Sequence, residues 1–128
     1  MQQTRVRKRP KHLALHQIRM PLPSIVSILH RISGAGLFLF LPIMLWLFDQ
    51  SVGTAEAFEA YRAFVSNPLI KLVLLGLIWA YLHHFCAGIR FLLLDIDVGG
   101  DLGPARRSSV AVLVISLFLT IVAGVALW

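Results

Sequence analysis

Three long apolar stretches constrain the fold of this chain more than any other feature of its sequence. They cover residues 24–48, 69–94 and 109–128, and a helix needs about 20 apolar residues to cross a bilayer. Hydrophobic residues make up 58% of the sequence, above the roughly 45–50% that is usual for soluble domains. The sequence therefore predicts an all-α membrane protein, with one domain over residues 1–128, three transmembrane helices and membrane lipid around them.

Basic residues are concentrated on one predicted side of the membrane. They precede the first stretch at Arg5, Arg7, Lys8, Arg9, Lys11 and Arg19, and they follow the second stretch at Arg106 and Arg107. The segment between the first two stretches holds more acids than bases. Because cytoplasmic loops carry the excess of Lys and Arg, we expect a cytoplasmic N-terminus and a periplasmic C-terminus.

The basic arm before residue 20 allows two other interpretations. Nucleic-acid binding is not expected, because the arm is short and lacks interleaved aromatic residues. A targeting presequence would explain the absence of acids, but the arm is poor in serine, which such peptides favour. The charge distribution therefore favours a topology signal.

Local signals place the ends of the helices. Ser24 follows two prolines and is a suitable N-cap for the first span. Residues 55–64 have the pattern of a short amphipathic helix, which we expect at the outer interface. Pro68 suits the first turn of the second span, and Gly99-Gly100 with Gly103-Pro104 predict a tight turn before the third.

A polar stripe lies near the start of the first span. Ser27, His30, Arg31 and Gly34 have the i, i+3, i+4, i+7 spacing of residues on one helix face. Snorkelling of long side chains to the lipid headgroups would explain a lone arginine. A hydroxyl, a histidine and a cation on one face are explained better as donors to a quinone carbonyl or to a haem propionate.

A histidine in the middle of the second span is the clearest sign of function. A titratable ring at membrane depth is costly and marks a functional site by default. His84 has small residues, Ala80 and Gly88, one turn to either side. They leave flat space for a porphyrin, so we expect His84 to bind haem iron as an axial ligand. For His83, on a different face, we expect an interhelical hydrogen bond.

The surroundings of such a haem follow from helix geometry. Arg90 lies six residues beyond His84, about 9 Å along a helix axis, where a propionate would meet its charge. A six-coordinate haem needs a second ligand. We expect it from a partner subunit, because His30 is predicted at a shallower depth than His84.

In combination, these motifs resemble the cytochrome b556 membrane-anchor subunits of bacterial succinate dehydrogenase, a succinate:ubiquinone oxidoreductase. The similarity rests on Arg9-Pro10, Leu13, Leu15 and Ile18-Arg19, on the segment Ser27–Gly34, on His84 followed by Gly88-Ile-Arg90, and on Leu94-Asp95. It covers nearly the whole chain. Phe91 is a departure, because relatives can carry histidine there.

The resemblance implies a respiratory complex of four subunits in the bacterial inner membrane. A flavoprotein oxidises succinate, an iron–sulfur subunit relays electrons, and two three-helix anchors share one haem b and form the ubiquinone site. It further implies that His84 is one haem ligand, that Ser27 and Arg31 bind ubiquinone, and that His30, Arg31 and Arg90 lie near the propionates. The chain itself contributes no catalytic residue for succinate oxidation, since its acids all lie outside the three apolar stretches.

Two other classes of protein remain as alternatives. A haem-free structural anchor, of a related fumarate reductase or of another membrane complex, would leave the setting of His84 unexplained. A transporter would carry charges through the membrane thickness or inverted repeats. Apart from Lys71 near the start of the second span, the outer half of every predicted span is apolar, which argues against a transport path.

Overall fold

The computed structural model describes residues 17–128, which form four α-helices. These are α1 (Leu22–Val52), α2 (Ala55–Ser66), α3 (Pro68–Asp95) and α4 (Leu102–Leu127). The basic arm and the motif residues before position 17 lie outside the described residues. Helices α1, α3 and α4 are each long and apolar enough to cross a membrane, which confirms the predicted all-α architecture with three candidate spans.

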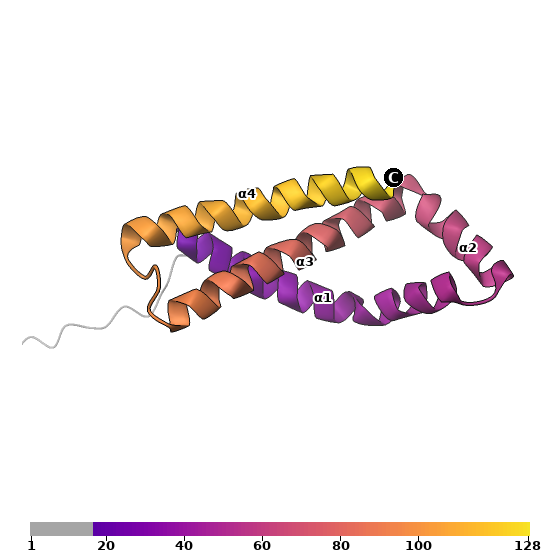
Figure 1. Cartoon of the computed structure of the whole chain (residues 1–128), viewed down its shortest axis with the longest axis horizontal. Coiled ribbons are helices and arrows are strands. Elements are labelled where there is room, and N and C mark those ends of the chain that lie inside the picture. Colours follow the sequence, from indigo (N-terminus) through magenta and orange to yellow (C-terminus); the bar gives the residue numbers. More distant parts are fainter. Residues whose placement is uncertain (1–16) are drawn as a thin grey trace, which may run out of the picture.

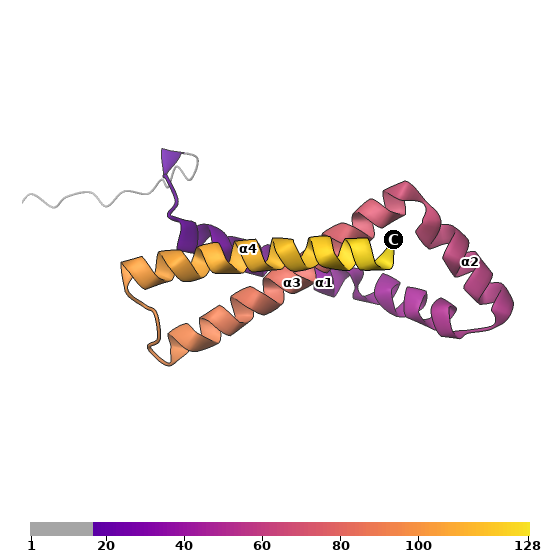
Figure 2. The ribbon, with the colours of Figure 1, turned by 45° about the horizontal axis from the view of Figure 1, so that its top comes forward.

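The three long helices are arranged around α3. Helix α3 crosses α1 and also packs against α4, while the short α2 bridges the end of α1 and the start of α3 (Figure 1). The turned view shows α4 running over the point where α1 and α3 cross (Figure 2). The chain ends beside the start of α3, so α2, the first turn of α3 and Trp128 lie at the same end of the molecule.

The start of α1 differs from the prediction. The helix begins at Leu22, two residues before Ser24, and Pro21 is its N-cap in an extended conformation. The Ser24 amide donates to the carbonyl of Pro21 at 2.9 Å. The predicted N-cap, Ser24, was wrong because Pro23 can lie in the first turn of the helix. The N–H groups of that turn have no partner within the helix, so the missing N–H of proline costs no hydrogen bond.

The start of α3 follows the sequence signal closely. Pro68 is its first residue, and the side chain of the N-cap Asn67 accepts from the Leu69 amide at 2.9 Å. The last long helix begins earlier than its predicted span, at Leu102. Arg106 and Arg107 therefore lie in the first turns of α4 and not in a loop. The predicted start was late because it was taken from the apolar stretch, and a helix can extend beyond its apolar part. The turn before α4 contains Asp97 and Gly99 at positive φ.

Helix α4 faces the bundle with a row of small and polar side chains. The buried residues on this helix are Ala105, Ser109, Val112, Ser116 and Thr120. Their hydroxyls bond within the helix, as Ser109 Oγ does to the Ala105 carbonyl at 2.7 Å and Thr120 Oγ1 to the Ser116 carbonyl at 2.7 Å. Small residues whose polar groups are satisfied locally let membrane helices approach closely.

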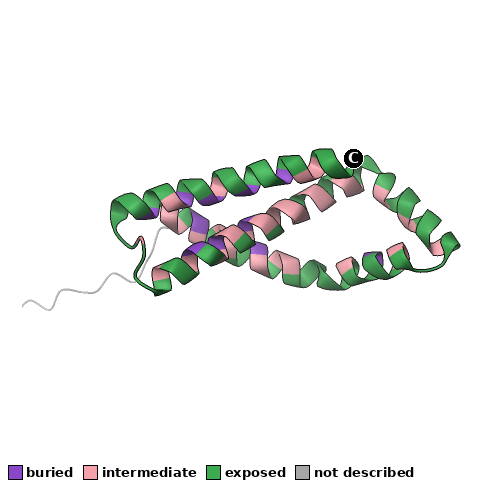
Figure 3. Cartoon of the chain, viewed as in Figure 1, coloured by how far each residue is buried: buried purple, intermediate pink, exposed green. Residues whose placement is uncertain are grey.

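Burial is confined to the inner faces of the helices. Exposed residues cover the outer sides of the helices, and most buried residues lie where α1, α3 and α4 face one another (Figure 3). Val26, Ala87 and Val112, one from each long helix, form a small apolar cluster. A protein surface this apolar suits lipid or other subunits, since lipid tails are as apolar as the side chains they contact.

Candidate functional site

The ring of His84 lies against the polar stripe of α1. Its Nδ1 atom is 3.0 Å from the carbonyl oxygen of His30 and 3.3 Å from Ser33 Oγ. The hydroxyl of Ser33 itself donates to the same His30 carbonyl at 2.9 Å. A carbonyl oxygen only accepts, so this contact requires the proton of a neutral His84 ring to be on Nδ1. Nε2 then keeps its lone pair.

A hydrogen bond of this kind usually supports a histidine that binds a metal. Such a histidine donates its other ring N–H to a carbonyl or carboxylate, which sets the tautomer and the ring orientation. The residues around His84 therefore fit an axial ligand to haem iron through Nε2. Ser33 was not predicted as part of the site, although its spacing of three residues from His30 was a usable signal.

The space for the imidazole comes from α1. A Cβ atom on Gly34 would lie 2.7 Å from Cε1 and 3.1 Å from Nδ1 of His84, distances that the ring does not allow. A Cβ on Gly88 would lie 3.8 Å from Nε2 of His30, an ordinary contact. The prediction was that Ala80 and Gly88, on the same helix as His84, make room for the ring. In the structure, the glycine that the ring requires is Gly34 on the neighbouring helix α1.

His30 lies at the level of His84 and not above it. The two rings are stacked, with centroids 4.1 Å apart and planes 9° from parallel. The predicted shallower position was wrong because depth was counted from the helix ends, whereas α1 and α3 cross and are offset. Phe91, the departure from the family pattern, packs on the other side of His30 with a centroid distance of 5.1 Å.

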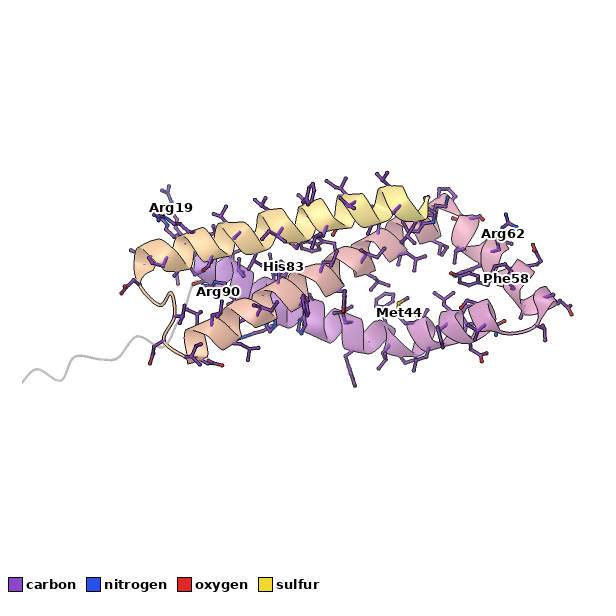
Figure 4. The ribbon with its side chains drawn as sticks, in the orientation of Figure 1. Arg19, Met44, Phe58, Arg62, His83 and Arg90 are labelled. Carbon is purple, nitrogen blue, oxygen red and sulfur yellow. The ribbon has the colours of Figure 1, made fainter. Side chains whose placement is uncertain are left out.

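His83 occupies a different environment from its neighbour. It is fully buried among the three long helices, and its ring packs against Trp79 with centroids 5.3 Å apart (Figure 4). Neither of its ring nitrogens has a hydrogen-bond partner among residues 17–128. The expected interhelical hydrogen bond therefore stays a prediction, with the backbone of Val26 on α1 as the nearby candidate partner.

A hollow with two arginines, here called the cationic hollow, lies beside the histidines at the end of the bundle where α1 begins. It has a volume of about 370 Å³ and is lined by Pro23, Ser24, Ser27, Ile28, Arg31, Arg90, Phe91 and Leu94. The structure thus brings together three predicted site residues, Ser27, Arg31 and Arg90, from two helices. A hydroxyl and two guanidinium groups at one hollow form a site for an oxygen acceptor that gains negative charge.

Arg90 is held in place by a residue that the sequence did not single out. Its side chain is buried, and its Nε donates to Ser108 Oγ on α4 at 3.0 Å, while the guanidinium lies 5.3 Å from the centre of the Phe91 ring. Ser108 in turn donates to the Ala105 carbonyl. Nothing in the local pattern of α4 indicated this partner, because the contact depends on how α3 and α4 are rotated.

Fold and site together define a small multi-pass membrane subunit with a ligand-type histidine inside the bundle and a cationic hollow beside it. The chain belongs to the family of succinate dehydrogenase/fumarate reductase transmembrane subunits, which matches residues 5–123. It is 37% identical to the succinate dehydrogenase cytochrome b556 subunit of Coxiella burnetii, over 94% of this chain and 98% of the relative.

Other relatives carry the same name. The succinate dehydrogenase cytochrome b556 subunits of Rickettsia felis and Paracoccus denitrificans are each 32% identical over 88% of this chain, and the match covers 88% and 87% of their lengths. These findings confirm the resemblance drawn from the motifs. The chain is a multi-pass subunit of the bacterial inner membrane and works as part of a succinate dehydrogenase complex.

Proposed function

We propose that this chain is an anchor subunit that binds haem b and forms part of the site where ubiquinone is reduced. The observation that carries the proposal is the pair of contacts from His84 Nδ1 to the His30 carbonyl and to Ser33. They orient one ring nitrogen inward and leave the other for iron. The name cytochrome b556, which the relatives carry, agrees with a b-type haem.

The haem-binding role is assigned to His84, with cationic support on the side where α1 begins. When bound, the haem supplies a one-electron carrier inside the membrane. His84 would be the iron ligand from this chain, a histidine of a second three-helix anchor would be the other, and one haem would be shared per complex. His30, Arg31 and Arg90 are the residues of this chain nearest to where propionates would lie.

The quinone-binding role is assigned to the cationic hollow. Ser27 Oγ–H and the Arg31 guanidinium are placed to donate hydrogen bonds to a quinone carbonyl, and Arg90 adds charge from α3. Fixed donors stabilise negative charge that develops on an oxygen in a water-poor site. These residues therefore hold the quinone head and favour its reduced form, while succinate oxidation takes place in other subunits.

The proposed complex divides the reaction among its subunits. A flavoprotein oxidises succinate, and an iron–sulfur subunit docks over the Ser27–Arg31 face and delivers electrons to ubiquinone. That face lies on the cytoplasmic side if the N-terminus is cytoplasmic, as the distribution of Lys and Arg favours. Two electrons and two protons per quinone are then available from the same side of the membrane.

The absorption spectrum of the purified complex tests the haem assignment. His84→Leu should remove the reduced b-type band or shift it, because the iron loses an axial ligand. His83→Leu is the matched control, one residue away on the same helix. Its ring packs on Trp79 and takes no part in the hydrogen bonds that orient His84, so the reduced band should remain.

An unchanged six-coordinate spectrum in the His84→Leu complex would contradict the assignment. Loss of the band in both variants would indicate that it depends on packing of α3 and not on ligation. A wild-type complex without any haem band would favour the structural anchor of a haem-free enzyme.

A further inference from the structure

A large apolar cavity among the described residues plays no part in the proposed haem and quinone sites. It has a volume of about 730 Å³ and lies where α1 and α3 diverge below α2, at the end of the molecule opposite the cationic hollow. Side chains from all four helices line it, among them Leu41, Tyr61, Leu77 and Trp128. Figure 4 shows Met44, another lining residue, on the side of α1 that faces this space.

The shape of this cavity limits what can fill it. A transmembrane helix is at least 10 Å wide, so about 730 Å³ would hold only about 9 Å of it, fewer than two turns. Helix α2 closes the cavity at one end, where a spanning helix would have to continue. A flexible hydrocarbon chain meets neither obstacle. An unfilled space would cost the lining side chains their dispersion contacts on one side.

A lysine lies against one of the aromatic residues that line the cavity. The ammonium of Lys71, in the first turn of α3, lies 5.8 Å from the centre of the Trp128 ring, which lines the cavity. No acid occurs in the first turn of α3, and the only acidic residue of the helix is Asp95 at its far end. Tryptophan and tyrosine prefer the headgroup level of a bilayer, so Trp128 and Tyr61 mark the depth of Lys71.

We propose that this cavity holds an acyl chain of one anionic glycerophospholipid, whose phosphate is bound by Lys71. The lipid comes from the leaflet on the α2 side. The ammonium supplies charge-assisted donors to the phosphate, and the apolar lining takes the hydrocarbon. Bound in this way, the acyl chain contacts both α1 and α3 where these helices diverge, next to α2. The assignment does not depend on haem or quinone binding.

Native mass spectrometry of the purified complex measures this binding. The complex is delipidated in detergent and titrated with phosphatidylglycerol carrying palmitoyl and oleoyl chains. Lys71→Gln should weaken the tightest lipid site about tenfold or more, the loss expected when a charge-assisted hydrogen bond is removed. Lys71→Arg should retain the site. Leu77→Trp, which fills the cavity, should remove it.

Arg107→Gln is the control for charge alone, since it removes one cation from the first turns of α4, at the opposite end of the molecule. Equal lipid affinity in the wild type and Lys71→Gln would overturn the proposal, as would an equal loss in Arg107→Gln. Loss of a ubiquinone mass instead of a phospholipid mass in Leu77→Trp would also overturn it. If Leu77→Trp fails to assemble, Lys71→Gln alone decides the outcome.

Discussion

Two glycines on α1, two residues apart, have opposite surroundings. A Cβ on Gly34 would lie 2.7 Å from the His84 ring, whereas a Cβ on Gly36 would meet nothing within 4 Å. The difference follows from rotation around the helix, because only the Gly34 side faces α3. One methyl group therefore has very different effects at the two positions.

Gly34→Ala should disturb haem binding while Gly36→Ala leaves it intact. The added methyl pushes the His84 ring away from the His30 carbonyl, and overpacking of this kind costs about 1–3 kcal/mol. The measurement is haem content per complex together with the reduced absorption maximum. If both variants kept the wild-type spectrum, the close contact between Gly34 and His84 would not exist in the assembled complex.

Ser27→Ala and Arg31→Ala should slow the reduction of quinone by succinate. For Arg31, the loss of a charge-assisted hydrogen bond of about 1.5–3 kcal/mol corresponds to at least a tenfold drop. Succinate oxidation with an artificial acceptor that takes electrons upstream should remain, which serves as the internal control. Normal quinone reduction in both variants would mean that this part of α1 only contacts lipid headgroups.

At the scale of elements, the contact between α3 and α4 depends on small side chains. Ser116 is fully buried in the row that α4 turns toward the bundle, and a Cβ on Gly124 would lie 3.0 Å from Leu75 of α3. This close approach sets the rotation of α4 and thereby brings Ser108 to Arg90.

Ser116→Leu should destabilise the subunit by separating the two helices. Adding two heavy atoms and a branch to a side chain in a packed seam costs about 1–3 kcal/mol, seen as a lower melting temperature of the complex in detergent. Ala111→Leu is the matched control, because Ala111 on the same helix is exposed. Equal melting temperatures for the two variants would show that the row on α4 is not tightly packed in the complex.

At the scale of the whole molecule, the three long helices enclose very little. Val26 and Ala87 are the only apolar residues among positions 17–128 that are completely buried, and most large apolar side chains are exposed. Such a bundle gives His84 support on the α1 side and leaves further haem contacts to another subunit.

Expressed without partners, the chain should not hold haem stably. It offers one supported ligand, and the second anchor supplies the other together with the remaining walls of the pocket. The measurement is haem bound per chain after extraction in detergent, with the assembled complex as the positive control. Stoichiometric six-coordinate haem in the isolated subunit would contradict the shared site and would make His30, already stacked on His84, the second ligand.

The sequence alone determined the elements of this protein and the residues that matter in it. Apolar length predicted three spans, and the pattern after residue 54 predicted the short helix that the structure has at Ala55–Ser66. Pro68 marked the start of α3 correctly. Such predictions succeed because a membrane helix satisfies its backbone internally, so its existence depends on its own residues. The polar residues at membrane depth stood out for the same local reason.

Only the tertiary structure decided how those residues meet. It placed His30 level with His84, made Gly34 the residue that admits the imidazole, and joined Arg90 to Ser108. It also placed the fully buried His83 ring against Trp79, on a side away from the His84 contacts. Each of these depends on the offset, crossing and rotation of two helices. Those quantities are set by close packing between small residues far apart in the chain, which no local pattern records.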